Sequence, residues 1–168
     1  MFYVELFREL QRFEVRYLLI GGVAVNLHGI GRLTADVDLM LALDAENLAK
    51  FVTAGEALGL KPVIPVALAD VANAEKVQSW IEQKGMLALA LRPPEKTAPT
   101  LDILVRPVVP FEEAYGRRVE RSLGGAVVAV ASIEDIIRLK TGTGRQKDEA
   151  DIAALRQILR MEGAPYDV

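Results

Sequence analysis

The sequence contains no cysteine and only one histidine, His28. Without cysteine the chain can form neither a disulfide framework nor a thiolate zinc site, and a single histidine excludes most multi-histidine metal sites. The N-terminal segment is apolar but carries Glu5, Arg8, Glu9 and Arg12, so it lacks the uncharged core of a signal peptide or membrane span. We therefore expect a cytoplasmic protein that has no membrane partner.

The charge balance is also unremarkable, with 20 basic and 23 acidic residues and a net charge of −3. No overall basic field favours nucleic acid or membrane surfaces. The alternative is a local basic face that binds RNA, formed by Arg138, Lys140, Arg145, Lys147, Arg156 and Arg160. Half of the 168 residues (51%) are hydrophobic, which suffices for one buried core. We predict a single domain over 1–168, with a core over about 1–131 and a C-terminal helical element over about 132–168.

Hydrophobic periodicity and turn residues predict an alternating order of helices and strands. Helices are predicted at 2–13, 23–29, 44–57 and 70–84, after Pro110, and in two terminal segments joined by "TGTGRQ" at 141–146. Strands are predicted at 15–20, 36–41, 86–91 and 100–105, followed by a hairpin with its turn at Gly124-Gly125. This order predicts an α+β (α/β) fold, a mixed β-sheet with helices packed on it and a C-terminal helical pair.

Three aspartates stand inside apolar strand patterns. Asp36 and Asp38 occur in "DVDLML", and Asp102 occurs in "TLDILV". Residues i and i+2 of a strand share a face, and two neighbouring carboxylates repel unless a cation such as Mg²⁺ joins them. If the two strands are neighbours, the three carboxylates converge and could hold two Mg²⁺ ions about 4 Å apart for an in-line phosphoryl or nucleotidyl displacement. Alternatively, all three lie on the wet face of a half-covered sheet.

A glycine pair, Gly21-Gly22, ends the strand predicted at 15–20 and opens a helix. Glycine lets backbone N–H groups at a helix N-terminus approach a phosphate. The pair belongs to no G-x-G-x-x-G dinucleotide fingerprint, and "TGTGRQKD" does not match a P-loop. The alternative is a plain tight turn.

Four short patterns occur together in a fixed order. They are G-G, a short helix ending in H-G followed by R-x-T-x-D-x-D, a later strand with a central Asp, and a Lys followed by R-x-K-D-x-x-D. This combination resembles the DNA polymerase β-like nucleotidyltransferase superfamily. It is most similar to small bacterial nucleotidyltransferases of the abortive-infection toxin and minimal antibiotic nucleotidyltransferase types. The resemblance covers roughly 15–42 and 100–155.

The resemblance implies a role for each matching residue. Gly21 and Gly22 would hold the triphosphate. Asp36 and Asp38 would hold the metals, and Asp102 would be the third metal-binding carboxylate and the candidate acceptor of the hydroxyl proton. These aspartates are also the implied catalytic residues, and the implied cofactor is Mg²⁺, with two ions expected and Mn²⁺ as an alternative.

Basic residues supply the remaining candidate nucleotide ligands, namely Arg32, Lys140, Arg145 and Lys147. Lys140 matches the phosphate-binding lysine of the resemblance, and a guanidinium such as that of Arg32 suits phosphate. Arg145 and Lys147 would bind phosphate or the acceptor. Alternatively, they are plain exposed charges without a role in the site. Asp148 and Asp151 are expected to fix the terminal helix, whose first turns favour carboxylates.

The implied activity is metal-dependent transfer of NMP from an NTP to a hydroxyl acceptor, with release of pyrophosphate. The acceptor stays open between tRNA, a protein and a small molecule. The protein is also a candidate toxin of a toxin–antitoxin pair, with an antitoxin or other partner protein. Two alternatives stand beside this hypothesis. One is a catalytically degenerate protein that binds nucleotide or a partner, and the other is a metal-dependent phosphohydrolase, which the single histidine disfavours.

Overall fold

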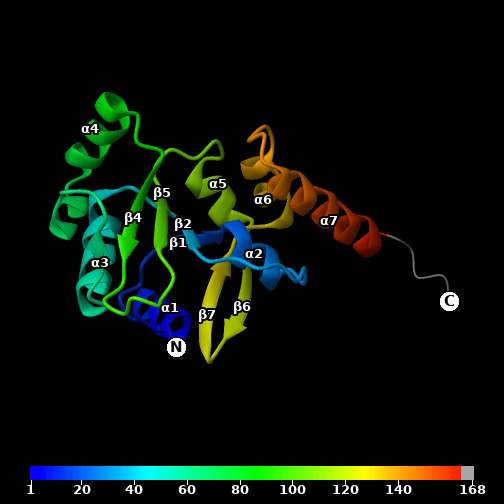
Figure 1. Cartoon of the computed structure of the whole chain (residues 1–168), viewed down its shortest axis with the longest axis horizontal. Coiled ribbons are helices and arrows are strands. Elements are labelled where there is room, and N and C mark those ends of the chain that lie inside the picture. The colour runs from blue at the N-terminus through cyan, green and yellow to red at the C-terminus, as the bar shows by residue number, and fades with distance from the viewer. Residues whose placement is uncertain (164–168) are drawn as a thin grey trace.

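The computed structural model describes residues 1–163, which form a seven-stranded sheet with helices packed on it (Figure 1). In chain order the elements are α1 (Phe2–Arg12), β1 (Tyr17–Ile20), α2 (Gly21–Leu27), β2 (Val37–Leu41), α3 (Ala45–Ala57), β3 (Lys61–Pro62), the 3-10 helix η1 (Leu68–Ala72), α4 (Ala74–Lys84), β4 (Ala88–Arg92), β5 (Leu101–Leu104), α5 (Phe111–Gly116), β6 (Val119–Leu123), β7 (Ala126–Val130), α6 (Ile133–Lys140) and α7 (Gln146–Glu162). No helix within residues 1–163 is both long and apolar enough to cross a membrane.

The sheet is mixed, and its strand order is β3-β4-β5-β2-β1-β7-β6. Strand β2 pairs in parallel with β5, and β1 pairs in parallel with β7, while the other neighbours are antiparallel. The predicted hairpin is present as β6 and β7, whose turn lies at Gly124-Gly125. The predicted fold class, a mixed sheet with helices packed on it, is confirmed.

The two faces of the sheet differ in how well they are covered. One face carries Tyr17 and is packed by α1, where Phe7 stacks on Tyr17 with ring centroids 5.9 Å apart. The register places Asp38 beside Ile20 and opposite Asp102, so these carboxylates share the other face. Helix α2 packs on β1 and β2 and also contacts α6.

Strands β4 and β5 are buried on only one of their faces. Leu89, Leu91, Leu101 and Ile103 are buried, whereas the alternate residues are half-buried or exposed. The apolar run at 86–91 is typical of a buried strand, but Leu87 precedes β4 and is 61% exposed. An apolar run alone does not reveal that no helix covers one of its faces.

Several predicted boundaries are corrected by the structure. Strand β2 begins at Val37, so Asp36 and Thr34 lie in the preceding loop. The helix predicted over 70–84 is divided, because the Asn73 side chain accepts the Lys76 N–H at 3.1 Å and starts α4 after η1 has ended. Strand β3 was not predicted, since two residues that include a proline show no alternation.

The C-terminal helical pair is present as α6 and α7, which pack against each other, and α6 also contacts α2 (Figure 1). Ser132 caps α6 by accepting the Asp135 N–H at 3.1 Å. The buried Asp135 carboxylate accepts two hydrogen bonds from Arg117, each of 2.9 Å, and these hold its pKa below the ordinary value against the effect of burial. The division of the chain into one domain with a helical element stays a prediction.

Candidate active site

All nine residues that the sequence predicted as catalytic, metal-binding or nucleotide-binding line one cavity of about 910 Å³. They are Gly21, Gly22, Arg32, Asp36, Asp38, Asp102, Lys140, Arg145 and Lys147. They come from four separate parts of the chain, which the fold brings together where β1, β2 and β5 face α6 and the start of α7. Their chemical roles stay predictions, but their shared location is a property of the structure.

The carboxylates lie on neighbouring strands. Asp38 of β2 is the direct register partner of Asp102 of β5, and Asp36 is exposed one residue before β2. Within residues 1–163, none of the three side chains accepts a hydrogen bond or forms an ion pair. The buried Asp135, Asp148 and Asp151 are all paired with basic side chains. Of these six aspartates, only Asp36, Asp38 and Asp102 have no basic partner within residues 1–163.

Burial, and after it the neighbouring negative charge, raises the pKa of two of the groups. The pKa of Asp38 is raised to about 6, chiefly by burial and then by the charges of Asp102 and Asp36, against a lowering by Lys140 and Arg145. The pKa of Asp102 is also raised, first by burial and then by Asp36. Beyond burial, the like charges close by therefore disfavour the ionised forms of Asp38 and Asp102.

The donor set fits a hard divalent cation, because it consists of carboxylate oxygens whose mutual repulsion an ion would remove. Within residues 1–163, however, no three acidic, His or Cys side chains already stand in an arrangement that could hold a metal ion. An ion would therefore have to draw the carboxylates of Asp36, Asp38 and Asp102 together.

The glycine pair has a steric role that the sequence interpretation did not include. Gly21 has a φ of +68°, and a Cβ placed there would overlap Asp38 Oδ2 and lie 2.7 Å from Asp38 Cγ. A Cβ on Gly22 would lie 2.5 Å from Thr34 Oγ1. No side chain caps the first turn of α2, so its N–H groups are free of capping partners. Gly21 thus lets Asp38 approach the beginning of α2, and Gly22 does the same for Thr34.

Gly21→Ala is expected to lower any metal- and nucleotide-dependent activity at least about 100-fold, because the new methyl group displaces the Asp38 carboxylate. A matched control is Gly85→Ala, where φ is +61° and a Cβ would meet no atom within 4 Å. Both variants should lose about 1–2 kcal/mol of unfolding free energy from the left-handed backbone, but only Gly21→Ala should lose activity. Equal activity in the two variants would contradict the steric role.

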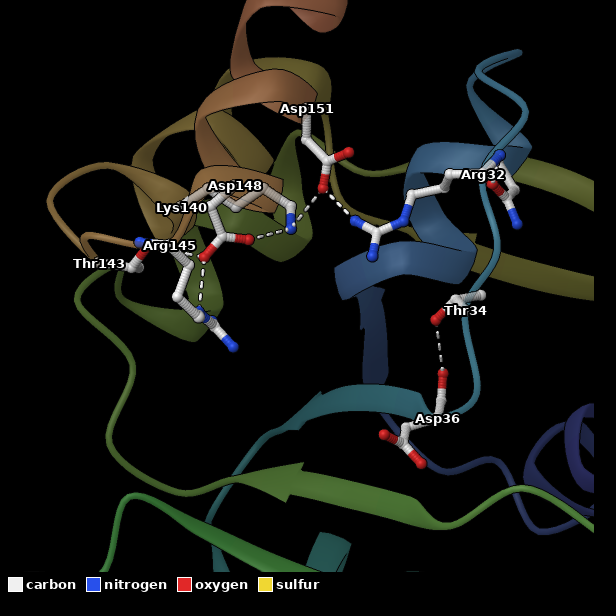
Figure 2. A network of polar contacts seen from close by, with 9 residues as sticks. Arg32, Thr34, Asp36, Lys140, Thr143, Arg145, Asp148 and Asp151 are labelled. Atoms are coloured by element: carbon white, nitrogen blue, oxygen red, sulfur yellow. Dashed lines mark hydrogen bonds and ion pairs between the residues drawn. The ribbon is translucent and has the colours of Figure 1, made fainter.

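The candidate phosphate ligands are held by two aspartates of α7 (Figure 2). Lys140 Nζ lies 2.8 Å from Asp148 Oδ1 and 3.0 Å from Asp151 Oδ2. Asp148 also accepts the Arg145 Nε–H at 2.9 Å and the Thr143 hydroxyl at 2.6 Å. These contacts agree with the expectation that Asp148 fixes the terminal helix.

Asp151 connects two distant parts of the site. Its Oδ2 atom accepts a hydrogen bond from Arg32 Nη1 and also contacts Lys140, so it lies between the two cations (Figure 2). Sequence analysis did not predict the Arg32–Asp151 pair, because the two residues are 119 positions apart. Lys147 is exposed and, within residues 1–163, forms no ion pair.

His28, the lone histidine, takes no part in the cavity. Its Nε2 lies 2.8 Å from the carbonyl oxygen of Ala131, where it joins the end of α2 to the segment before α6. This contact gives His28 a packing role.

No protein-family model matches the sequence, and no curated protein matches it. Solved structures do match in fold. The lincosamide antibiotic adenylyltransferase LnuA, solved with lincomycin bound, is 19% identical with a TM-score of 0.60, and the match covers 94% of each chain. A nucleotidyltransferase-like antigenic protein of Paracoccidioides brasiliensis is 18% identical with a TM-score of 0.55, over 93% of this chain and 72% of that one.

The antibiotic-resistance factor ANT(2'')-Ia in complex with adenylyl-2''-tobramycin also matches. It is 17% identical with a TM-score of 0.52, and the match covers 94% of this chain and 97% of that chain. At such identities the likeness concerns architecture, and each match extends over nearly all of the present chain. The chain therefore has the fold of the nucleotidyltransferases.

Proposed function

We propose that the protein is a metal-dependent nucleotidyltransferase that transfers NMP from an NTP to the hydroxyl group of a small molecule and releases pyrophosphate. One observation carries this proposal. Asp38 and Asp102 have no ion-pair partner within residues 1–163 and lie on neighbouring parallel strands, in a cavity that also contains a glycine pair and four basic side chains. The solved structures of LnuA and ANT(2'')-Ia support it, because both are named for modification of antibiotics or resistance to them.

In the proposed reaction the acceptor oxygen attacks the α-phosphorus of the NTP. The new O–P bond forms as the bond from the α-phosphorus to the bridging oxygen of the β-phosphate breaks, and pyrophosphate leaves. Asp102 is the candidate acceptor of the hydroxyl proton, since its raised pKa makes it a better base than an ordinary aspartate. A bound divalent cation would neutralise the phosphate charge and the carboxylates of Asp36, Asp38 and Asp102.

The triphosphate would lie between the beginning of α2 and the basic residues of the C-terminal helical pair. Uncapped N–H groups at Gly21-Gly22 favour phosphate, and Lys140 faces the cavity from α6. Arg145 has a side chain that is 75% exposed, and Lys147 is exposed as well, so both can turn toward a phosphate. Asp148 and Asp151 then hold Lys140 and Arg32 in place.

The toxin hypothesis uses the same chemistry with tRNA or a protein as acceptor and an antitoxin as partner. It rests on the sequence motifs alone and predicts that label appears on RNA or protein. A catalytically degenerate protein would instead bind NTP and transfer nothing. A phosphohydrolase would release inorganic phosphate without labelling any acceptor.

The test is incubation with Mg²⁺, each of four α-labelled NTPs, and three acceptor pools: small hydroxyl compounds, total tRNA and a cell lysate. We expect release of pyrophosphate and label on the small compounds. Asp102→Asn should lower transfer at least about 100-fold through loss of a base and a metal ligand, whereas Glu56→Gln, which changes an exposed side chain of α3, should leave it unchanged. NTP binding without transfer to any pool would overturn the proposal.

A further inference from the structure

The cavity wall formed by β4 and the end of β5, on the side of Asp102 away from the glycine pair, is apolar. The register of β4 and β5 places Ala88 opposite Leu104 and Ala90 opposite Asp102, so all four share the open face of the sheet. Leu87, just before β4, adds a side chain that is 61% exposed. We call Leu87, Ala88 and Leu104, all of which line the cavity, the apolar platform.

The basic groups of the cavity lie elsewhere. Every basic residue that lines it comes from the loop before β2 or from the segment between Lys140 and Lys147. The strand order β4-β5-β2-β1 therefore arranges the chemistry in sequence, from the apolar platform through Asp102 and Asp38 to the glycines that follow β1. If the phosphates lie at the glycine end, the platform is left for the group that Asp102 would deprotonate.

We propose that the apolar platform binds the acceptor, and that the acceptor is an uncharged small molecule with an apolar face beside its reactive hydroxyl. This inference rests on the proposed function. A polycationic amino sugar needs carboxylates of its own, yet none of the three platform residues is acidic, and the nearby carboxylates of Asp36, Asp38 and Asp102 are those that would hold the cation. Nucleic acid needs basic groups there, and the platform supplies none. A cavity of about 910 Å³ is of the size that takes drug-sized ligands.

The small side chains of the platform suit a flat or ring-shaped apolar group. Ala88 is exposed and Leu104 half-buried, so a ligand can lie directly on the sheet. Burial of each additional methylene group contributes enough to change affinity about three- to four-fold. The acceptor's apolar part should therefore determine its KM.

The experiment uses a matched series of neutral acceptors, the n-alkyl β-glucosides from methyl to hexyl, with tobramycin and total tRNA as charged competitors. With Mg²⁺ and labelled NTP, we expect kcat/KM for the glucoside to rise about three-fold with each of the first few added methylene groups. The rise should come from a lower KM for the glucoside and not from a higher kcat. Leu87→Asp should remove this dependence and leave the KM for NTP unchanged. The control, Val127→Asp, changes an apolar side chain that is 46% exposed on β7 and lies outside the cavity.

The outcomes separate this inference from the proposed function. Transfer to tobramycin or tRNA in preference to every alkyl glucoside, unaffected by Leu87→Asp, would overturn the inference and keep the function. A raised KM for NTP in Leu87→Asp, with an unchanged alkyl dependence, would assign the platform to the nucleobase and overturn it too. If no acceptor is labelled, saturation-transfer NMR decides, since the inference requires hexyl glucoside to bind the wild-type protein and not Leu87→Asp.

Discussion

Asp38→Asn is expected to abolish nucleotidyl transfer and, at the same time, to stabilise the metal-free protein. The activity should fall at least about 1,000-fold, because the variant loses the most buried of the three carboxylates that would bind the cation. The unfolding free energy at pH 7.5 should rise by about 2–3 kcal/mol. This gain equals the free energy that the wild-type protein loses by keeping Asp38 ionised where it is largely buried and lies near two like charges.

The pH dependence of this gain follows from the raised pKa. The pKa of Asp38 is about 6 in the folded chain and 3.8 ordinarily, so between these values the folded state binds more protons than the unfolded state. Wild-type stability therefore falls as the pH rises from about 4 to about 6 through this group. Asparagine does not titrate in this range. The gain in unfolding free energy of the variant should therefore be absent at pH 3.5 and complete above pH 6.5.

Urea unfolding at pH 3.5 and pH 7.5, without divalent cations, measures this effect. Glu56→Gln is the matched control, because it removes an exposed carboxylate on α3 that forms no ion pair within residues 1–163. Its stability should match that of the wild type at both pH values. An Asp38→Asn variant that is less stable than the wild type at pH 7.5 would show that the Asp38 carboxylate is structurally required.

Lys140→Met is expected to destabilise the protein by about 3 kcal/mol or more. Lys140 is 9% exposed and lies between Asp148 and Asp151, which are 4% and 6% exposed. Removing one partner of a buried ion pair leaves uncompensated charge and costs about 3–5 kcal/mol. Arg145 and Arg32 still pair with one aspartate each, so the loss should lie near the lower end of this range.

Urea unfolding measures the loss of stability. Limited proteolysis at 141–146 measures how firmly α7 is attached to α6, because these ion pairs join the two helices. Proteolysis should be faster in Lys140→Met than in Lys147→Met, the control that removes an exposed lysine of the same cavity. The added substitution Asp148→Asn should recover part of the lost stability, because it removes one of the two buried carboxylates that Lys140 neutralises in the wild type. A loss below about 1 kcal/mol in Lys140→Met would contradict a structural role for the network.

The parts of the site that could be predicted are those with a contrast in local sequence. A carboxylate in an apolar strand and a glycine pair at a strand end stand out without any knowledge of neighbours, as Asp38, Asp102 and Gly21 do. Whether the two aspartate strands are adjacent could only be stated as a condition, since β2 and β5 are separated by α3, β3, η1, α4 and β4. The structure fulfils that condition in the register of Asp38 and Asp102.

Other features have no local signal at all. The pairing of Arg32 with Asp151 joins the loop before β2 to the last helix. The sequence suggested a phosphate ligand for the one and a helix-fixing role for the other, and neither role indicates the partner. The clash that would follow from a side chain on Gly21 depends on the Asp38 carboxylate, which a turn prediction cannot place. The open face of β4 depends on where the helices pack, so the strand pattern of 86–91 could not reveal it.

The central claim is that the aspartates and the glycine end of the cavity form one site for a divalent cation and a nucleotide. Its most direct test is equilibrium binding of Mn²⁺, measured by EPR, in the presence of a non-hydrolysable NTP analogue. We predict two bound ions per wild-type and Glu56→Gln chain, and loss of at least one in Asp38→Asn and in Asp102→Asn. Equal Mn²⁺ binding in all four proteins would contradict the claim.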